Sequence, residues 1–290
     1  MRAEPMRTPR TPEARSGSMA EPAAPAARRS AGARLRSYCD KVLAVAEMEV
    51  RKLRHDPTEL LTRAIQPTLW LLVFGGVFAR TRAIPTGELS YLDFLAPGIL
   101  AQSVLFVAIF YGISVIWERD LGIVHKFLVS PTPRTALVLG KALSAGVRAL
   151  SQALIVYALA LALGVKMNWQ LAALAGVVVL VVLGAAVFAT FSLIIACLVK
   201  TRERFMGIGQ VLTMPLFFAS NAIYPTDLMP AWLRWVAHGN PLTYEVDGLR
   251  ALMLAGGASV LGLSTDFAVL AATLVLLVAL AGRMYPRIVV

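Results

Sequence analysis

Residues able to make or break bonds are few in this chain and lie far apart. The pair Gly140-Lys141 lacks the glycine five residues upstream and the following Ser or Thr that a phosphate-binding loop requires. His55, His125 and His238 are scattered, and neither a His-Glu-x-x-His zinc motif nor a Gly-x-Ser-x-Gly nucleophile motif occurs. The sequence therefore predicts no catalytic site, no bound cofactor and no metal.

Charged residues do gather in one connection between apolar stretches. Residues 118–128 read Glu-Arg-Asp-Leu-Gly-Ile-Val-His-Lys-Phe-Leu, and two prolines, Pro131 and Pro133, follow closely. Proline disfavours helix in the residue before it, so this pattern predicts a short charged helix with a rigid stop. Such a helix is suited to contact another protein, and an ordinary solvated loop is the alternative.

The elements that position these residues are long and apolar. The 290 residues are 58% hydrophobic and only 16% charged, with a mean hydropathy of +0.69. The stretch between Lys166 and Lys200 has no charge and exceeds the roughly 20 apolar residues that cross a bilayer. The composition predicts an all-α integral membrane protein with six transmembrane helices. The predicted spans are Leu60–Ala79, Leu95–Trp117, Leu139–Val165, Leu171–Val199, Phe205–Tyr224 and Asp266–Arg283.

Three regions follow from this pattern. Residues 1–33 have almost no bulky apolar side chain and are predicted to be a disordered cytoplasmic tail, within which Met19 is an alternative start. Residues 34–58 are predicted to form an amphipathic interfacial helix, and residues 59–290 the six-span domain. Glu49 interrupts the apolar face of that helix, so it either meets a basic group on a partner or snorkels to water.

The segment from Thr226 to Leu254 precedes the last predicted span. It carries Trp232, Trp235 and Tyr244 around Asn240-Pro241. Aromatic residues are enriched at membrane interfaces, and proline is favoured at the first position of a helix. We predict short external helices here.

The 28 Lys and Arg residues and the formal charge of +11 reflect membrane topology rather than nucleic-acid binding. Most of them lie in the N-terminal tail and in alternate connections. By the positive-inside rule, both termini are expected in the cytoplasm of a multi-pass plasma membrane protein. The two cysteines, Cys39 and Cys197, lie far apart and suggest no disulfide framework.

The interior of the predicted spans contains no Asp or Glu, which an ion-coupled carrier usually needs at membrane depth. Only Arg63 and Arg148 fall there, and snorkelling of Arg148 is favoured over a contact with substrate or a subunit. Aromatic side chains and one amide are candidates for an apolar transport pathway, with ordinary packing as the alternative. These candidates are Phe74, Phe78, Phe106, Phe110, Phe217, Phe218 and Asn221.

Over about residues 36–283 the chain resembles the type-2 ATP-binding-cassette permeases, particularly exporters of the daunorubicin-resistance kind. The resemblance rests on a set of short motifs and on the charged connection. These are Arg54-His55-Asp56-Pro57, Gln66-Pro67, residues 94–100, residues 118–141, residues 240–244 and Leu249-Arg250.

The resemblance implies a permease subunit that dimerises, with itself or a sister permease, and sits on two separate cytoplasmic ATPase subunits. MgATP would bind those partners, and the segment from Glu118 to Leu128 would be the coupling helix. Alternating access at the dimer interface would then export a drug or antibiotic from a bacterial cell. The residues expected to couple to the ATPase are Glu118, Arg119, Asp120, Leu121, His125, Lys126 and Glu49.

Three other functions are weighed against drug efflux. The same fold could export a polysaccharide or a lipid-linked polymer. A membrane-embedded enzyme would need a nucleophile, metal or acid-base set that the sequence lacks. An ion-coupled carrier would need the missing intramembrane acids. The substrate itself is not encoded in any motif.

Overall fold

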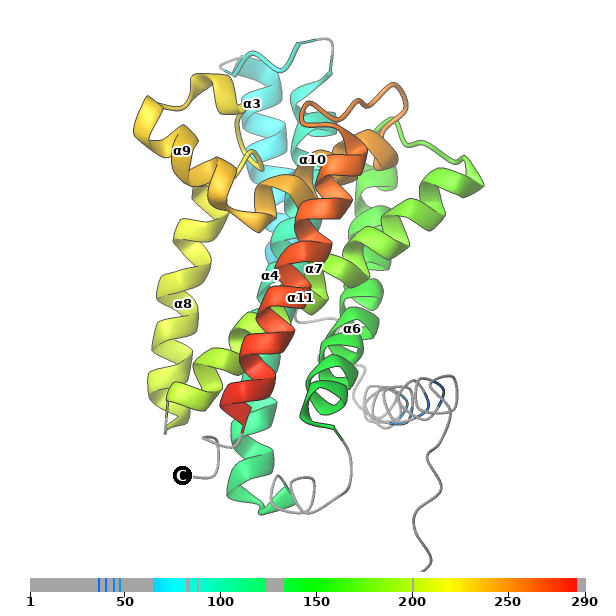
Figure 1. Cartoon of the computed structure of the whole chain (residues 1–290). Helices are drawn as coiled ribbons and strands as arrows, with labels where there is room; N and C mark the ends of the chain where they lie inside the picture. The colour runs from blue at the N-terminus through cyan, green and yellow to red at the C-terminus, as the bar shows by residue number, and fades with distance from the viewer. Residues whose placement is uncertain are drawn as a thin grey trace, which may run out of the picture.

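The computed structural model describes Arg36, Asp40, Ala44, Glu47 and residues 65–81, 84–87, 89–123, 133–199 and 201–285. These residues form an elongated helical bundle, and no β-strand occurs among them (Figure 1). Arg36, Asp40, Ala44 and Glu47 are helical and exposed. The tail 1–33, Glu49, His125 and Lys126 lie outside the described residues, so the disordered tail and the amphipathic helix stay predictions.

Four helices of the described part of the chain are long and apolar enough to cross a membrane. They are α4 (Tyr91–Asp120), α6 (Arg134–Ala162), α7 (Leu171–Leu198) and α11 (Leu263–Met284). With 22 to 30 residues at 1.5 Å rise each, they exceed the 30 Å thickness of the hydrocarbon core. They overlap the second, third, fourth and sixth predicted spans.

The other two predicted spans correspond to shorter helices. Residues Ile65–Phe78 are helical and apolar, and they include a π-helical segment, η1 (Trp70–Gly75), that continues into α3 (Gly76–Thr81). The fifth predicted span is α8 (Arg202–Phe218), which ends six residues earlier than predicted. At 17 residues, α8 measures about 25 Å. The count of six spans therefore stays a prediction.

Three short helices separate α8 from α11. They are η2 (Thr226–Leu228), α9 (Ala231–Gly239) and α10 (Pro241–Met253). Trp232 and Trp235 on α9 are 67% and 80% exposed, as an interfacial helix requires. In contrast, α10 is mostly buried, so it packs inside the bundle rather than along its surface.

Asn240 fixes where α10 begins. Its side-chain oxygen accepts a hydrogen bond from the Leu242 amide (3.0 Å), an N-cap followed by proline at the first helical position. Its side-chain amide donates to the carbonyls of Leu216 (2.7 Å) and Ala219 (3.1 Å). The start of α10 is thereby held against the end of α8, which draws the helix into the bundle.

The core lies around α4 and α7. Of the most apolar 18 residues of each helix, 78% are buried in α4 but only 11% in α11, so α4 is central and α11 peripheral. A row of small residues on α6 lets it approach α7 closely, as membrane helices require. A Cβ atom at Gly146, for example, would lie 2.9 Å from the Val182 side chain.

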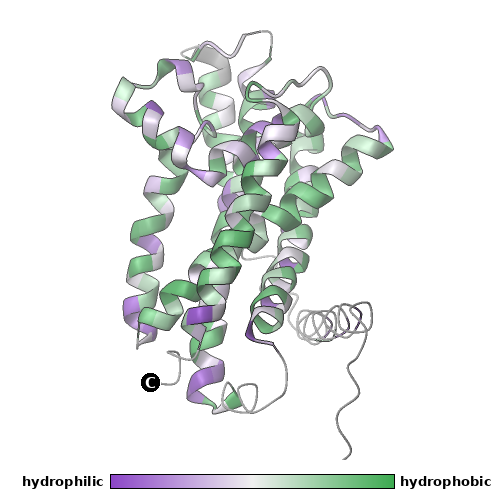
Figure 2. Cartoon of the chain, in the orientation of Figure 1, coloured by the Kyte–Doolittle hydropathy of each residue, from purple (hydrophilic) through white to green (hydrophobic). Residues whose placement is uncertain are grey.

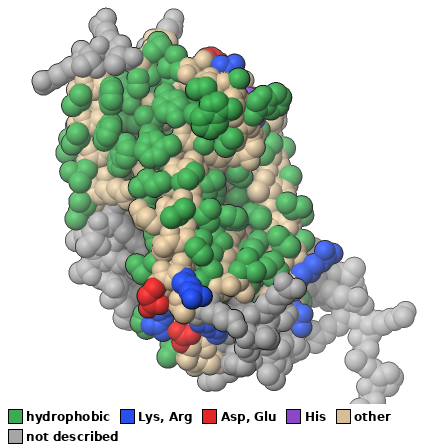
Figure 3. Space-filling model, turned by 90° about the vertical axis from the view of Figure 1, so that its left-hand side faces the viewer, with side chains coloured by type: hydrophobic (Ala, Val, Ile, Leu, Met, Phe, Trp, Pro, Cys, Tyr) green, Lys and Arg blue, Asp and Glu red, His purple; other side chains and the backbone are tan. Residues whose placement is uncertain are grey.

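Polar and apolar residues are segregated along the length of the bundle. Hydrophobic residues dominate its middle, and hydrophilic residues lie toward the two ends (Figure 2). On the face shown in Figure 3, charged side chains gather near the lower end, with a smaller group at the top. We call the lower end, with Asp120 and the start of α8, the Asp120 end, and the opposite one the α10 end.

Candidate functional site

A buried ion pair joins α4 to α6 at the Asp120 end. Lys141 Nζ lies 2.5 Å from Glu118 Oε2, and the two side chains are only 3% and 7% exposed. Helix α4 continues through Glu118 to Asp120, and Gly122 follows with a φ of 71°. The predicted start of a separate helix at Glu118 is therefore displaced, and this carboxylate faces Lys141 instead of the surface.

Next to this pair, four side chains form what we call the α4–α8 clamp: Trp117, Arg119, Asp120 and Arg202. Asp120 pairs with Arg119 (3.0 Å) through one carboxylate oxygen and with Arg202 (2.7 Å) through the other. The Arg202 guanidinium also lies over the Trp117 ring, 3.5 Å from its centre. Leu121, 68% exposed, comes directly after the clamp. Asp120 and Leu121 are thus at the surface and Arg119 is partly exposed, while their role in docking stays a prediction.

Most of the predicted pathway aromatics belong to one chain of ring contacts, which we call the aromatic ladder. Neighbouring ring centres are 4.3 to 6.5 Å apart. In order of contact, its members are Phe218, Phe217, Trp70, Phe74, Phe78, Tyr91 and Phe94. Phe106 and Phe110 instead form a separate stacked pair on α4. The ladder connects η1, α3, α4 and α8.

Arg250 closes the ladder at the α10 end. Its guanidinium lies 3.9 Å from the centre of the Phe94 ring and donates a hydrogen bond to the Asn221 carbonyl (2.9 Å). Burial lowers the pKa of Arg250 to about 10, against an opposing effect of Asp247, so the group stays charged at neutral pH. Asn221, predicted to line the pathway, is buried beside this arginine.

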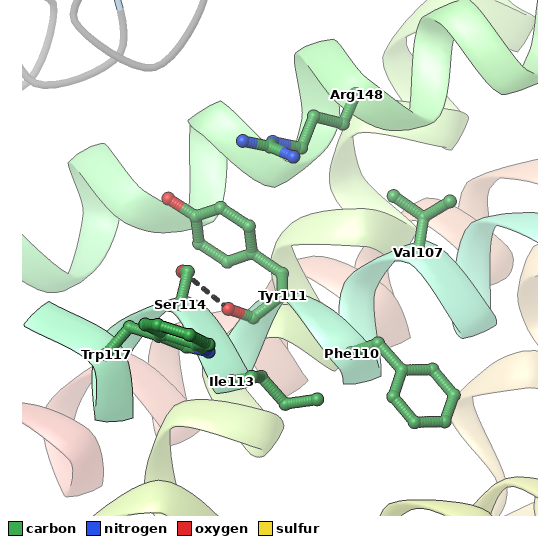
Figure 4. A pocket seen from close by; sticks show the side chains of 7 residues that line it. All are labelled: Val107, Phe110, Tyr111, Ile113, Ser114, Trp117 and Arg148. Carbon is green, nitrogen blue, oxygen red and sulfur yellow. Dashed lines mark hydrogen bonds between the residues drawn. The ribbon is translucent and has the colours of Figure 1, made fainter. Parts of the chain in front are cut away.

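A cavity of about 280 Å³ lies between α4 and α6, nearer the Asp120 end (Figure 4). Its lining is Val107, Phe110, Tyr111, Ile113, Ser114, Trp117 and Arg148. Arg148 reaches from α6 toward α4, with its guanidinium carbon 5.5 Å from the centre of the Tyr111 ring. The Ser114 hydroxyl donates to the Tyr111 carbonyl and is therefore occupied. The cavity presents one cation in a wall of mixed polar and apolar groups.

A larger apolar groove of about 610 Å³ lies between α6 and α7. Leu154, Leu161, Trp169 and Val178 are among its exposed lining residues. Tyr157 supplies the one hydroxyl of the lining. The apolar lining of the groove suits lipid chains or other apolar groups. None of the residues that line it was predicted from the sequence.

The sequence analysis missed Glu245 on α10, which is completely buried. Its carboxyl group lies against Gly184 of α7, where any Cβ atom would overlap with it. Burial raises the pKa of Glu245, which lies on a short helix outside the four spanning helices, well above its ordinary value. The sequence signals were a glycine, Gly184, in the apolar run of α7 and an acid in the external segment, and neither indicates by itself that the two residues meet.

Comparison with known proteins identifies the family. Residues 40–254 match the family model described as ABC-2 type transporter. The chain belongs to this family. The resemblance to type-2 ATP-binding-cassette permeases is therefore confirmed.

Named relatives of this ABC-2 permease agree. It is 30% identical to the ycf38 protein of Cyanophora paradoxa, named as a transport permease, over 69% of this chain and 70% of that protein. It is 27% identical to the daunorubicin resistance ABC transporter permease DrrB1 of Streptomyces coeruleorubidus, over 69% of this chain and 70% of that protein. It is 25% identical to the inner membrane transport permease YadH of Escherichia coli K12, over 73% and 80%.

Membership in the family establishes the general role of the chain. An ABC-2 permease is a membrane-embedded transport subunit and not a catalytic enzyme, and the family implies an ABC ATPase as partner. At the Asp120 end, the ion pair joins α4 to α6 and the clamp joins α4 to α8.

Proposed function

We propose that this ABC-2 permease is the membrane subunit of an ATP-driven exporter that moves a hydrophobic or amphipathic drug or antibiotic out of a bacterial cell. The observation that carries the proposal is the family match over residues 40–254 in a chain without a phosphate-binding loop. The name of the relative DrrB1 supports a drug as cargo. Energy has to enter through a partner that binds MgATP.

In this proposal the Asp120 end faces the cytoplasm of a plasma membrane. The described Lys and Arg residues favour that end, as the positive-inside rule expects. Those at the Asp120 end are Arg119, Arg134, Lys141, Arg202, Arg204 and Arg283, against Arg80, Lys166, Arg234 and Arg250 at the α10 end. The helix Ile65–Phe78, extended at its start, and α8 supply the first and fifth of six spans, and both termini are cytoplasmic.

The docking surface for the ATPase consists of the exposed residues that follow the buried ion pair. Arg119, Asp120 and Leu121 contact the partner, together with His125, Lys126 and Glu49 outside the described residues. Glu118 contributes indirectly, because its ion pair with Lys141 makes the end of α4 move together with α6. A push on the docking surface is thereby transmitted to three helices, α4, α6 and α8.

The transport pathway runs along the aromatic ladder at the interface of a permease dimer, formed with a second copy or a sister permease. Phe74 and Phe218, 36% and 44% exposed, face outward from the ladder, whereas Phe217 is buried and supports them. Phe106 and Phe110 continue the apolar surface along α4. ATP binding closes two ATPase copies and switches the dimer from inward to outward opening.

Drug accumulation in cells tests the proposal. The permease is expressed with its partner ABC ATPase in a strain sensitive to anthracyclines, and intracellular fluorescence of the drug is followed. Accumulation is expected to fall only when both genes are present and the ATPase is intact. Unchanged drug accumulation together with a new surface glycan would favour polymer export and contradict drug efflux.

A further inference from the structure

Glu245 places a carboxyl group beside the middle of a spanning helix. Its contact on α7, Gly184, is thirteen residues after Leu171 and fourteen before Leu198, about 20 Å from either end of the helix. The carboxyl occupies the space that a side chain at position 184 would fill. The side chain of Glu245 has no exposed surface. An acid at this depth is costly unless it has a function.

No hydrogen-bond donor of the described residues serves this carboxyl. Neither Glu245 Oε1 nor Oε2 has a partner among them. Along its whole length α7 carries no charged residue, so the helix that meets the carboxyl offers no counter-ion. An ionised carboxylate without donor or counter-ion would cost several kcal/mol here, and the neutral acid is the stable form.

The charged groups of the other helices around α10 are engaged elsewhere. On α4, Asp93 accepts hydrogen bonds from Ser90 and the Lys166 amide, and Glu118 pairs with Lys141. Asp247 of α10 and Asp266 of α11 both contact the Ser259 hydroxyl at 2.9 Å. The remaining titratable groups, with their contacts or positions, are Arg250 on the Asn221 carbonyl, Tyr244 on the His238 carbonyl, Tyr91 on the Ile223 carbonyl, Tyr111 beside Arg148, Arg119 with Asp120, Arg234 on the Asp227 and Met229 carbonyls, His238 in the last turn of α9, Cys197 in the last turn of α7, and Arg283 in the last turn of α11.

We propose that the Glu245 carboxyl is a proton-binding site, which holds its proton while α10 packs on α7 and releases it to outside water when the two helices separate. On separation, the carboxyl O–H bond breaks, water accepts the proton, and the carboxylate remains. In water a glutamate ionises near pH 4.3, so release is complete at neutral pH outside. Repacking of α10 then requires one proton from outside.

A proton is the ligand that fits this site, because the carboxyl is enclosed by protein and Gly184 leaves no room beyond it. Acid outside the cell favours the packed state of α10, and alkaline conditions favour the separated state. Regulation of export by outside pH rests on the proposed function. Proton binding by Glu245 is a property of the chain alone, so it can be tested without measuring transport.

Infrared spectroscopy of the purified full chain in lipid nanodiscs at pH 7.5 tests the site. Protonated carboxyl groups have a carbonyl stretch that ionised ones lack. The spectrum of wild type minus Glu245→Gln is expected to show the loss of one protonated acid. Glu203→Gln, at an exposed glutamate in the first turn of α8, is the matched control and should leave the band of the protonated acid unchanged. Loss of an ionised carboxylate in Glu245→Gln would overturn the proposal.

The glycine contact gives a second test. Gly184→Ala is expected to displace the carboxyl and abolish its protonated band, whereas Gly207→Ala, where an added Cβ meets no atom within 4 Å, should preserve it. In cells with the partner ATPase, export by wild type should respond to outside pH and export by Glu245→Gln should not. Absence of export in both would contradict the proposed function, while the infrared result still decides the proton site.

Discussion

At the scale of single residues, Lys141 and Glu118 show how a charge can be structural in a transport protein. Their ion pair lies almost without solvent contact between two spanning helices. Buried ion pairs contribute little net stability compared with apolar residues of similar size. Removal of one partner, however, leaves the other charge buried in an apolar environment without a counter-ion. The pair therefore acts as a specific connection between α4 and α6.

Replacing Lys141 by Met is expected to destabilise the permease by about 3 kcal/mol, because Glu118 loses its buried partner. The double variant Lys141→Met with Glu118→Leu should recover most of that loss. Thermal unfolding in detergent, analysed as a double-mutant cycle, measures both. A double variant as unstable as the sum of the single variants would show that the two side chains are not coupled.

Glu245 predicts a pH dependence of stability. Burial raises the pKa of Glu245 in the folded protein above the ordinary glutamate pKa of about 4.3. The contribution of this group to folding stability is therefore fully present below about pH 4.3 and is lost as the pH rises through the raised pKa. The unfolding temperature of wild type should fall over that window relative to Glu245→Gln. Parallel pH profiles for the two proteins would contradict the burial of an uncompensated acid.

At the scale of elements, the α4–α8 clamp joins two helices that are not adjacent in sequence. Its three charged side chains are between about one-fifth and one-third exposed, and exposed ion pairs add little stability. We expect Asp120→Arg to leave folding intact but to reduce ATP-dependent export strongly. Arg202→Asp should do the same, and the two changes together should restore the pair and part of the export. ATPase activity and export measured on the same membranes distinguish uncoupling from loss of the partner.

Close approach of α4 to the segment after α8 depends on Gly98. A Cβ atom at this position would overlap with the backbone of Ala222. Gly98→Ala is therefore expected to destabilise the protein by about 1–3 kcal/mol, since backbone cannot move aside as a side chain can. Gly76→Ala, in open space on α3, is the matched control. Equal unfolding temperatures for both variants would be inconsistent with this packing.

The elements also show what the sequence could and could not predict. Long apolar runs with few or no charges located α4, α6, α7 and α11, because membrane length and hydropathy are local properties of the chain. The burial of α10 was not predictable in the same way, since it depends on Asn240 binding the end of α8, a contact between separate elements. The predicted coupling residues differ in burial for a similar reason. Glu118 is buried because it pairs with Lys141, 23 positions away, whereas Asp120 lies at the surface.

At the scale of the whole molecule, the bundle has polar groups at both ends and an apolar middle (Figures 2 and 3). The Asp120 end carries the ion pair, the clamp and the predicted docking surface, and the α10 end carries Arg250 and the carboxyl cluster around Ser259. Helices α4, α6 and α7 run between the two ends. In the proposed mechanism, force applied at the Asp120 end changes helix packing at the α10 end.

Reconstitution in liposomes tests the central claim most directly. The purified permease, alone or with its ATPase, is inserted into vesicles, and ATP-dependent accumulation of a fluorescent amphipathic drug against its gradient is measured. We expect accumulation only when the permease, the ATPase and MgATP are all present. Accumulation by the permease alone, driven by an ion gradient without ATP, would contradict the assignment of this chain as the passive membrane half of an ATP-driven exporter.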